Sequence, residues 1–455
     1  MLPPLEIVAR LRPIDLVSPA SRRSATGPGP HRLGAVAPYL AATLTLDAGF
    51  GEIALVGADG VRLAGGYADG AIGLSVRTAA GAGSTHRSRR MGSLPSAPEA
   101  IALTLTGVHL TVWARDGRDW VVRGRVGLLD LVDTRDEEWL ASLTVEYDGG
   151  GGEHGDFGQL GLRDTRLVSH ADGSPYSPDG WVWLTATHAG PGFFDTAHTG
   201  LWRLDPVTLA LEHRSDLFFR RPTGTGVYGD HATHLVRDDD GWLVATSTWG
   251  DFDRRRPAVG ITLARTGADL TTGRHVLDTT AMALPLDGLR SRGQWDPHLV
   301  RIGDLWHVGF ASARKFFRFH PALAVGPTLD DLTLRAAATD RRATEGVTLL
   351  RLPDEQWRVL ASDGRDGRRG QRERFPVFDL DLTEVGALRA PYPTNIPWPS
   401  LVHTDGGWLM ATFDARRTGG PLPGYGTHGD LVVMRERRRD ADTIVRSATP
   451  PRGST

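Results

Sequence analysis

The sequence has no cysteine among its 455 residues, and its 52 basic residues include a single lysine, Lys315. Without cysteine, disulfide bonds and thiolate metal sites are excluded. The chain also has no large excess of positive or negative charge, because its 54 acidic residues bring the net charge to -2. Nucleic-acid-binding proteins normally carry a basic patch and a high isoelectric point, so this balance argues against that class of partner.

Long apolar runs are missing as well. No stretch approaches the roughly 20 apolar residues that a membrane-spanning helix needs, and residues 1–6 (MLPPLE) lack the basic segment and long apolar run of a signal peptide. We therefore expect a cytoplasmic protein that does not contact a membrane. Secretion with a leader missing from this sequence is the alternative that the residues leave open, and they do not indicate an oligomeric state.

What the sequence does contain is a fivefold repeat, in which an apolar pair is followed by a polar turn and a strand that begins with Trp. The apolar pairs recur at intervals of 68, 64, 50 and 52 residues, beginning at Leu167, Leu235, Leu299, Leu349 and Leu401. The tryptophans are Trp183, Trp242, Trp306, Trp357 and Trp408. Repeats of this period built from short strands are typical of a β-propeller with one four-stranded sheet per repeat. We predict five blades, with the recurring tryptophan as a packing residue.

The first third of the chain carries no copy of this repeat. Short strand-like runs, separated in places by Asp-Gly turns such as those at 59–60 and 116–117, predict a β-sandwich. The order of strand, turn and strand over residues 103–120 resembles a concanavalin-type, lectin-like jelly roll. One short helix is expected within residues 133–142.

The predicted fold class is therefore all-β, with an N-terminal β-sandwich followed by a five-bladed β-propeller. We place the accessory sandwich at residues 1–155, the propeller at 156–437 and a flexible tail at 438–455, because the tail is polar and contains proline. Four consecutive glycines, 149–152, precede the boundary. Their freedom at positive φ suits a tight turn before the last sandwich strand or the first propeller strand.

Acidic residues stand immediately before the apolar pair in several repeats. The third residue before each leucine is, in chain order, Asp164, Ala232, Asp296, Gly346 and Trp398. Glu345 lies one residue earlier in the fourth repeat, and Asp230 lies two residues earlier in the second. Since the innermost strand of every blade lines the central channel, these carboxylates are expected to converge on one pocket. Crowded like charges raise the pKa of at least one carboxyl and so separate an acid from a base, which is the pair that a glycosidase needs.

Three short segments resemble motifs of glycoside hydrolase family 43: Arg163-Asp164-Thr165, Trp295-Asp296-Pro297-His298 and Thr344-Glu345-Gly346. Families 32, 62, 68 and 117 are related to it and share its five-bladed propeller. The resemblance covers about residues 155–437. It implies that Asp164 is the general base, that Asp296 tunes the pKa of the acid and orients it, and that Glu345 is the general acid.

The resemblance also implies a glycosidase that removes a terminal arabinofuranosyl, xylosyl or fructofuranosyl unit from an oligosaccharide or glycoside, and a closed axial pocket suits exo rather than endo action. From the residues alone, Asp230 competes with Asp164 for the role of base. Three other functions stay open: a carbohydrate-binding propeller without catalysis, a glycoside phosphorylase, and a polysaccharide lyase on the same scaffold.

We expect that no cofactor is required, and we predict no metal ligands. The fifth repeat carries Trp398 where many family 43 enzymes place a channel histidine that holds a metal ion or its water shell. A structural calcium therefore stays only as an open alternative.

The remaining candidates for contact with substrate are polar, aromatic or basic. Asp230 and His234 share one face of an expected strand and His231 takes the other, so we expect one of the two histidines to line the channel. Trp295 is interpreted either as a platform on which a sugar stacks or as a core aromatic. Two further candidates, Arg314 and Arg318, suit recognition of a uronic acid or phosphate, because guanidinium groups bind carboxylate and phosphate through two parallel hydrogen bonds. The full set of candidate substrate-binding residues is Asp230, His231, His234, Trp295, His298, Arg314, Arg318 and Trp398.

Overall fold

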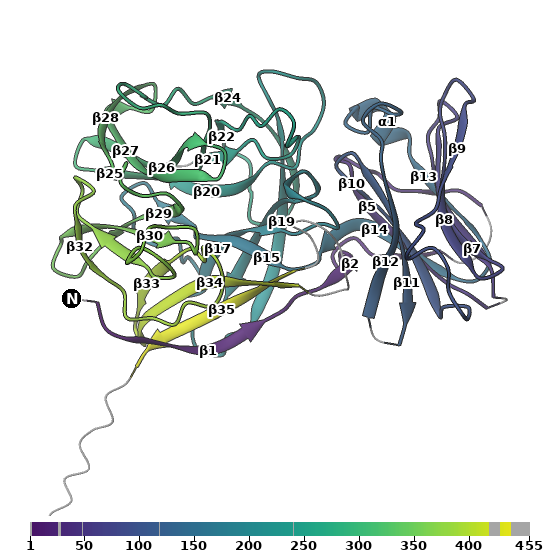
Figure 1. Ribbon diagram of the computed structural model, residues 1–455, viewed down its shortest axis with the longest axis horizontal. Coiled ribbons are helices and arrows are strands. Elements are labelled where there is room, and N and C mark those ends of the chain that lie inside the picture. The colour runs from purple at the N-terminus through teal and green to yellow at the C-terminus, as the bar shows by residue number, and fades with distance from the viewer. Residues whose placement is uncertain are drawn as a thin grey trace, which may run out of the picture.

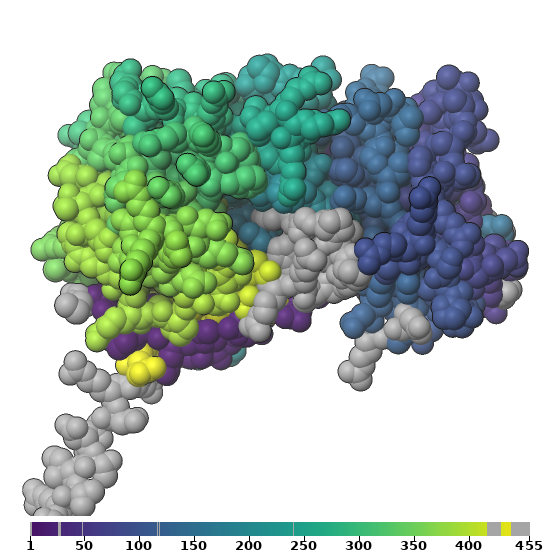
Figure 2. Space-filling view, viewed as in Figure 1, coloured from purple at the N-terminus to yellow at the C-terminus, as the bar shows by residue number. Residues whose placement is uncertain are grey.

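The computed structural model describes residues 2–25, 29–47, 49–117, 119–239, 241–417 and 428–437. Within these ranges the chain is almost entirely β-structure, which confirms the predicted fold class. Two lobes pack side by side, a β-sandwich coloured purple to blue and a β-propeller coloured mainly teal to yellow (Figures 1 and 2). No helix in the described ranges is long and apolar enough to cross a membrane.

Two antiparallel sheets form the sandwich. One has the strand order β12-β11-β10-β5-β14-β2, with β3 also paired to β14, and the other has the order β4-β13-β6-β7-β8-β9. The strands of the first sheet are β2 (Asp15–Val17), β3 (Arg23–Ala25), β5 (Tyr39–Thr45), β10 (Ala100–Thr106), β11 (His109–Asp116), β12 (Asp119–Gly127) and β14 (Gly152–Gln159). The strands of the second sheet are β4 (His31–Arg32), β6 (Gly51–Val56), β7 (Arg62–Ala68), β8 (Ala71–Arg77), β9 (Gly83–His86) and β13 (Thr144–Asp148).

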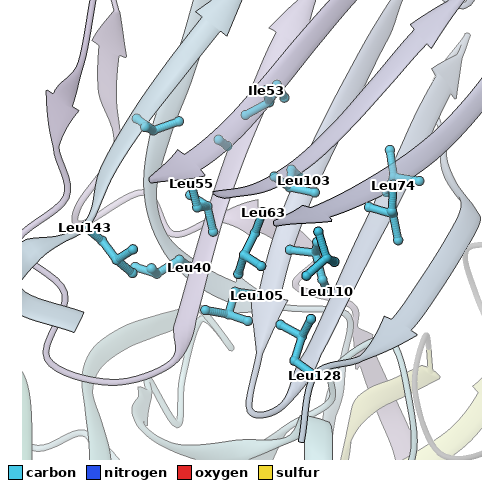
Figure 3. Packing of buried hydrophobic residues seen from close by; sticks show 14 of the residues in the cluster. Leu40, Ile53, Leu55, Leu63, Leu74, Leu103, Leu105, Leu110, Leu128 and Leu143 are labelled. Carbon is cyan, nitrogen blue, oxygen red and sulfur yellow. The ribbon is translucent and has the colours of Figure 1, made fainter. Parts of the chain in front are cut away.

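Apolar side chains from the facing sides of the two sheets form the sandwich core (Figure 3). Leu40 and Leu103 from the first sheet, and Ile53 and Leu63 from the second, are at most 1% exposed. Full burial of such a side chain stabilises the fold by about 1.5–3 kcal/mol. The alternation of apolar and polar residues along each strand directs these side chains into one shared layer.

The predicted short helix is α1 (Glu137–Ser142). Its first turn is capped by Asp136, whose side chain accepts a hydrogen bond from the backbone N–H of Trp139 at 2.7 Å. Trp139 and Leu140 are buried against the sandwich core, so the helix is fixed by one cap and one apolar face.

Five sheets form the propeller, which confirms the number of blades predicted from the repeat. Blade 1 contains β15 (Leu162–Leu167), β17 (Val182–His188), β18 (His198–Leu204), β19 (Leu211–Arg220) and β23 (Gly273–Asp278). Blade 2 contains β16 (Ser169–His170), β20 (His231–Asp238), β21 (Gly241–Ser247), β22 (Ile261–Thr266) and β24 (Thr280–Ala281). Blade 3 contains β25 (Gln294–Ile302), β26 (Leu305–Lys315), β27 (Arg318–Thr328) and β28 (Asp331–Ala337). Blade 4 contains β29 (Thr344–Arg351), β30 (Trp357–Asp363), β31 (Pro376–Phe378) and β32 (Glu384–Ala387). Blade 5 contains β33 (Ser400–Thr404), β34 (Gly407–Arg417), β35 (His428–Glu436) and β1 (Leu5–Leu11).

The innermost strands of neighbouring blades contact one another. Strand β15 contacts both β20 and β33, and β25 contacts both β20 and β29. This order arranges the five sheets around a central channel, which the innermost strands line.

The outermost strand of blade 5 comes from the opposite end of the chain. Strand β1 pairs antiparallel with β35 and runs beside it along the lower edge of the propeller in Figure 1. The assignment of residues 1–155 to a single sandwich unit is therefore wrong for this strand. An isolated alternating strand has the same pattern whichever sheet it joins, and only the closed ring shows that β35 offers an edge for β1 to cover.

The change from sandwich to propeller lies between β14 and β15. Strand β14 pairs with β5 in the sandwich, whereas β15 pairs with β17 in blade 1. The glycines at 149–152 thus lead into the last sandwich strand, whose first residue is Gly152. The predicted tail, residues 438–455, lies outside the described residues.

Candidate active site

A β-bulge occurs at the same place in the innermost strand of four blades. The register of pairing with the second strand shifts between Arg163 and Arg166, His231 and His234, Trp295 and His298, and Glu345 and Thr348. Inside each bulge, one residue has a positive φ: 49° at Asp164, 60° at Ala232, 61° at Asp296 and 70° at Gly346. Bulges bend a strand and change the direction of its side chains. The position three residues before each leucine is therefore where four strands redirect their side chains together.

The bulge in blade 4 requires glycine for a second reason. A Cβ atom added at Gly346 would lie 2.4 Å from Cδ1 of Trp398, the residue at the equivalent position of blade 5. The ring of Trp398 therefore packs directly on the backbone beside Glu345. Trp398 and Glu345 line the same cavity.

The bulges open into a cavity of about 330 Å³ at this end of the channel. Its described walls contain the three predicted catalytic acids, Asp164, Asp296 and Glu345, which come from blades 1, 3 and 4. They also contain three of the predicted substrate-binding residues, His231, Trp295 and Trp398. The structure thus brings these six side chains together, while their roles stay predictions.

The carboxyl group of Glu345 opens onto the cavity and is enclosed by protein elsewhere. This burial is the main reason why its pKa is raised to about 7, and the nearby Asp164 raises it further. Trp295 donates a hydrogen bond from Nε1 to Oε2 of Glu345 at 3.0 Å, which lowers the pKa, as does Arg163. The balance leaves a carboxyl group that both holds and releases a proton near neutral pH.

Asp296 lies deeper and is only 2% exposed. Burial first, and then the neighbouring Glu345 and Asp164, raise its pKa well above the ordinary range, and Arg166 acts in the opposite direction. Its Oδ2 atom is buried and accepts no hydrogen bond from the described residues. Asp296 is therefore expected to hold a proton, or to share one, when Asp164 and Glu345 carry charge.

Beneath the acids lies Arg166, a residue that the sequence analysis missed. Its side chain is fully buried, and it donates to the backbone oxygen of Val347 at 2.7 Å and to the Thr348 hydroxyl at 3.2 Å. Its guanidinium group stacks 4.8 Å from the ring centroid of Trp398. Burial lowers the pKa of Arg166 to about 10, and the nearby acids oppose this change. The arginine thus connects three blades and supplies a cation below the carboxyl groups. No sequence signal singles it out, because its strand also contains Arg163, Asp164 and Thr165 and only its two leucines are apolar.

Asp230 does not line the cavity, which removes the geometric basis for its role as a competing base or as a substrate contact. It is fully buried, and its Oδ2 accepts from Nε of Arg221 at 2.8 Å while Oδ1 accepts from the N–H of Gly250 at 3.0 Å. A carboxylate that is already paired and hydrogen-bonded in this way has a structural role.

His234 and His298 also lie away from the acids. Their rings stack at 4.2 Å between centroids, and Nδ1 of His234 accepts from the backbone N–H of Leu299 at 3.0 Å. His298 instead borders a second cavity of about 310 Å³, whose lining includes members of the apolar pairs, such as Leu350 and Val402. The bulge explains the difference, because it breaks the simple alternation that predicted a shared face for His298 and the catalytic aspartate.

Arg314 and Arg318 are exposed at the turn between β26 and β27 and are not among the residues that line the cavity. Phe317, which lies between them, does line it. The basic lining residues are instead Arg163 and Arg254. An arginine-rich turn alone therefore did not indicate which side chain points inward.

Aromatic rings form the remaining wall of the cavity: Phe193, Phe194, Trp249, Trp295, Phe317, Phe319 and Trp398. Several of them pack on one another, with centroids 4.4 Å apart for Phe194 and Trp249 and 5.3 Å apart for Trp249 and Trp295. Such a wall offers flat apolar faces beside the charged groups.

Side chains of the sandwich hold the two loops that carry part of this wall. The loop with Phe193 and Phe194 is bound by His109, whose Nε2 lies 2.6 Å from Oδ2 of Asp195, and by Arg125, which donates to the backbone oxygen of Pro191 at 2.9 Å. The loop after Trp249 is bound by Arg135, which donates to the backbone oxygen of Gly250 at 3.1 Å. The sandwich is therefore part of the structure that positions the cavity walls.

One group of three side chains in the described part of the chain could hold a metal ion, namely His188, His213 and Asp216 of blade 1. Oδ1 of Asp216 lies 3.0 Å from Nε2 of His213 and 3.5 Å from Nδ1 of His188. However, Trp202 donates to Nε2 of His188 at 2.8 Å. The proton of the neutral ring is then on Nδ1, the atom that would face the ion. The donor set therefore does not fit a metal, and none of these residues is among those that line the candidate active site.

No family model matches the chain, and no curated protein does. Solved structures do resemble it at low sequence identity. A GH43_1 enzyme from Xanthomonas citri is 14% identical over 62% of this chain and 89% of that one, with a TM-score of 0.42. A family 117 glycoside hydrolase from Zobellia galactanivorans is 10% identical over 60% and 84%, with a TM-score of 0.42. A mutant levansucrase from B. megaterium is 10% identical over 60% and 81%, with a TM-score of 0.43. These values are too low for the similarity to support an argument about function.

Proposed function

We propose that this chain is a glycosidase that cleaves a terminal arabinofuranosyl, xylosyl or fructofuranosyl unit in the propeller cavity. The observation that carries the proposal is the environment of Glu345. Its carboxyl group faces a cavity that it shares with Asp164 and Asp296, and its pKa is raised to about 7. Glycoside hydrolysis needs two carboxyl groups of different proton affinity beside the same bond, one as acid and one as base or nucleophile.

In this mechanism Glu345 protonates the glycosidic oxygen as the bond to the anomeric carbon breaks, and Asp164 serves as the base that activates water. Asp296 limits the negative charge on the three carboxyl groups, because burial first, and then the other two acids, raise its pKa. Arg166 supplies fixed positive charge beneath them. The proton held by Glu345 passes to the leaving group, and the proton taken from water passes to Asp164.

Exo action is supported by the size and the walls of the cavity. A volume of about 330 Å³ lies at the lower end of the range of about 300–1,000 Å³ for small-molecule sites. The aromatic rings leave flat apolar faces against which one sugar ring can lie. A terminal unit fits this description better than the interior of a long chain.

Phosphorolysis is the second candidate, because Arg163 and Arg254 both line the cavity. Guanidinium groups suit a phosphate whose oxygen would attack the anomeric carbon in place of water. Release of a sugar phosphate that depends on added inorganic phosphate would identify this reaction, whereas release of free sugar identifies hydrolysis.

The test compares the wild type with Glu345→Gln on alkyl arabinofuranosides, xylosides and fructofuranosides, whose leaving groups need a proton. We expect the substitution to lower kcat at least about 10²-fold, the low end of acid–base contributions, because glutamine keeps the shape and accepts from Trp295 but donates no proton. Glu138→Gln is the matched control, since Glu138 is exposed on α1. Binding of saccharides without turnover by wild type and variant alike would instead indicate a carbohydrate-binding propeller.

A further inference from the structure

A second cavity with a pronounced charge lies on the sandwich. It has a volume of about 650 Å³ and is formed by β9 with the turn that follows it and by β12. These two strands are the outermost strands of their sheets. The described lining residues include four arginines and no carboxylate; the arginines are Arg87, Arg90, Arg123 and Arg125.

The four guanidinium groups lack the carboxylate partners that some other arginines of the sandwich have. Arg62 pairs with Glu52 at 2.6 Å, and Arg22 lies 3.6 Å from Asp15. None of the four lining arginines forms an ion pair with a carboxylate of the described residues, and the buried Nε of Arg123 has no hydrogen-bond partner among them. Asp195 is near enough to stabilise the charge of Arg125, but cations without a direct ion pair still repel one another, and an anion placed between them would relieve that repulsion.

Two of the arginines are held in place before any ligand arrives. Arg87 donates from Nε to the backbone oxygen of Gly92 at 3.0 Å and from Nη2 to the Ser93 hydroxyl at 2.7 Å. Arg125 donates from Nη1 to the backbone oxygen of Pro191 at 2.9 Å. Groups fixed in this way lose little freedom when they bind, so more of the interaction energy appears as affinity.

The sequence around this cavity is also poor in acidic residues and contains several basic ones. Between Asp69 and Glu99 no acidic residue occurs, while this stretch contains His86, Arg87 and Arg90, which all line the cavity. The outer edges of β9 and β12 are unpaired within their sheets. Their backbone groups are therefore available to hydroxyl groups of a ligand.

We propose that this cavity binds the anionic group of an acidic saccharide, a carboxylate or a sulfate or phosphate ester, so that the sandwich is a binding module for charged glycans. The saccharide part rests on the proposed glycosidase function, and the anion part does not. Guanidinium groups recognise all three anions through paired hydrogen bonds. The neutral hydroxyl groups of the chain would meet the open strand edges.

The test is isothermal titration of the full chain with a trigalacturonate, with the neutral galactose trimer, and with inorganic phosphate and sulfate. We expect the charged trimer to bind more tightly than all three other probes. The double variant Arg87→Gln/Arg123→Gln should weaken that binding at least about tenfold, since charge-assisted hydrogen bonds are lost. Arg89→Gln is the matched control, because Arg89 is exposed in the same turn but does not line the cavity. Thermal unfolding checks that each variant is folded.

Several results would overturn the proposal: equal binding of the charged and neutral trimers, an equal loss in the double variant and in Arg89→Gln, or no binding of any probe. Phosphate binding as tightly as the charged trimer would overturn the saccharide part. Measuring the same titrations and the turnover of glycosides on the wild type separates the two proposals. Charged-trimer binding by a wild type that turns over no glycoside would contradict the glycosidase and support the module, and wild-type turnover without such binding would do the reverse.

Discussion

The surroundings of Glu345 shift the pKa of its carboxyl group in opposite directions. Burial and the nearby Asp164 raise its pKa, while Trp295 and Arg163 lower it, and the result is a pKa of about 7. A glutamate in water has a pKa near 4.3 and would be almost fully ionised at neutral pH. The protein environment therefore converts a poor proton donor into one that works near neutral pH.

This balance predicts the basic limb of the pH profile. Because the acid form of Glu345 is the working form, kcat/KM should fall as pH rises through about 7, approaching tenfold per unit. The hydrogen bond from Trp295 lowers the pKa of Glu345. Trp295→Phe should therefore raise that pKa and move the limb to higher pH.

The control for that shift is Trp249→Phe. Trp249 lines the same cavity and packs 5.3 Å from Trp295. Both variants lose an indole, so a change in packing would affect both profiles alike. A limb that moves equally in the two variants, or that moves to lower pH in Trp295→Phe, would contradict the assigned hydrogen bond.

Single residues were predicted to different extents. Asp164, Asp296 and Glu345 could be predicted to share a cavity because the repeat aligns them. Asp230 could not be separated from them, since a sequence does not show that Arg221 already pairs with it. Arg166 was missed because only the folded ring shows that a strand residue of blade 1 reaches Val347 in blade 4.

At the scale of one element, the repeated bulge decides where side chains point. The same register shift occurs in the innermost strands of blades 1 to 4. A non-glycine residue at positive φ costs about 1–2 kcal/mol. Three of the four bulges have such a residue at this position. Such strain concentrates at functional sites, and here it is shared by Asp164 and Asp296, two of the proposed acids.

Gly346→Ala tests the bulge of blade 4. The new Cβ would lie 2.4 Å from Trp398 at a backbone φ of 70°. We expect a loss of roughly 1–3 kcal/mol in the free energy of unfolding together with lower kcat, because Glu345 is the adjacent residue. Chemical denaturation and steady-state kinetics measure the two effects.

Gly386→Ala is the control for this substitution. Gly386 lies in β32, and an added Cβ would meet nothing within 4 Å. This variant should unfold as the wild type does and keep its activity. Wild-type stability in Gly346→Ala would show that Trp398 and the bulge adjust freely, which contradicts a rigid site.

Strand positions followed from the sequence, whereas the bulges did not. Alternation along a regular strand predicts that residues two apart share a face, and this rule placed His298 beside Asp296. The extra residue in the bulge turns Asp296 toward one cavity and leaves His298 at the other. Register shifts depend on the partner strand, so an isolated strand sequence does not reveal them.

At the scale of the whole molecule, the sandwich supports the propeller site from outside. His109 binds the loop that carries Phe193 and Phe194, and Arg135 binds the loop after Trp249. Loops are the most mobile part of a fold and rely on such contacts for a fixed position. The two lobes are therefore expected to act as one functional unit.

His109→Ala should release the loop that carries Phe193 and Phe194. We expect KM to rise about three- to tenfold with a smaller change in kcat, since a partly buried hydrogen-bonded pair contributes on the order of 1 kcal/mol. Arg62→Ala is the control, because it removes an ion pair with Glu52 within the sandwich. Equal effects of the two substitutions on KM would contradict a positioning role for His109.

The ring of five blades could be predicted from the repeat, but its closure could not. Strand β1 lies far in sequence from β35, with which it pairs. Contacts between distant segments leave no local pattern, and the loop closure that they require is decided by the folded ring. The same holds for the contacts of His109 and Arg135, which join a sandwich residue to a propeller loop.

Leaving-group dependence in Glu345→Gln tests most directly whether Glu345 is the acid among the three carboxyl groups. The measurement compares kcat on the dinitrophenyl glycoside and on the alkyl glycoside of a sugar that the wild type accepts. A dinitrophenolate leaves without protonation, so the variant should keep most of its rate on that substrate and lose at least about 10²-fold on the alkyl glycoside. Equal losses on both substrates, or no loss on the alkyl glycoside, would contradict proton donation by Glu345.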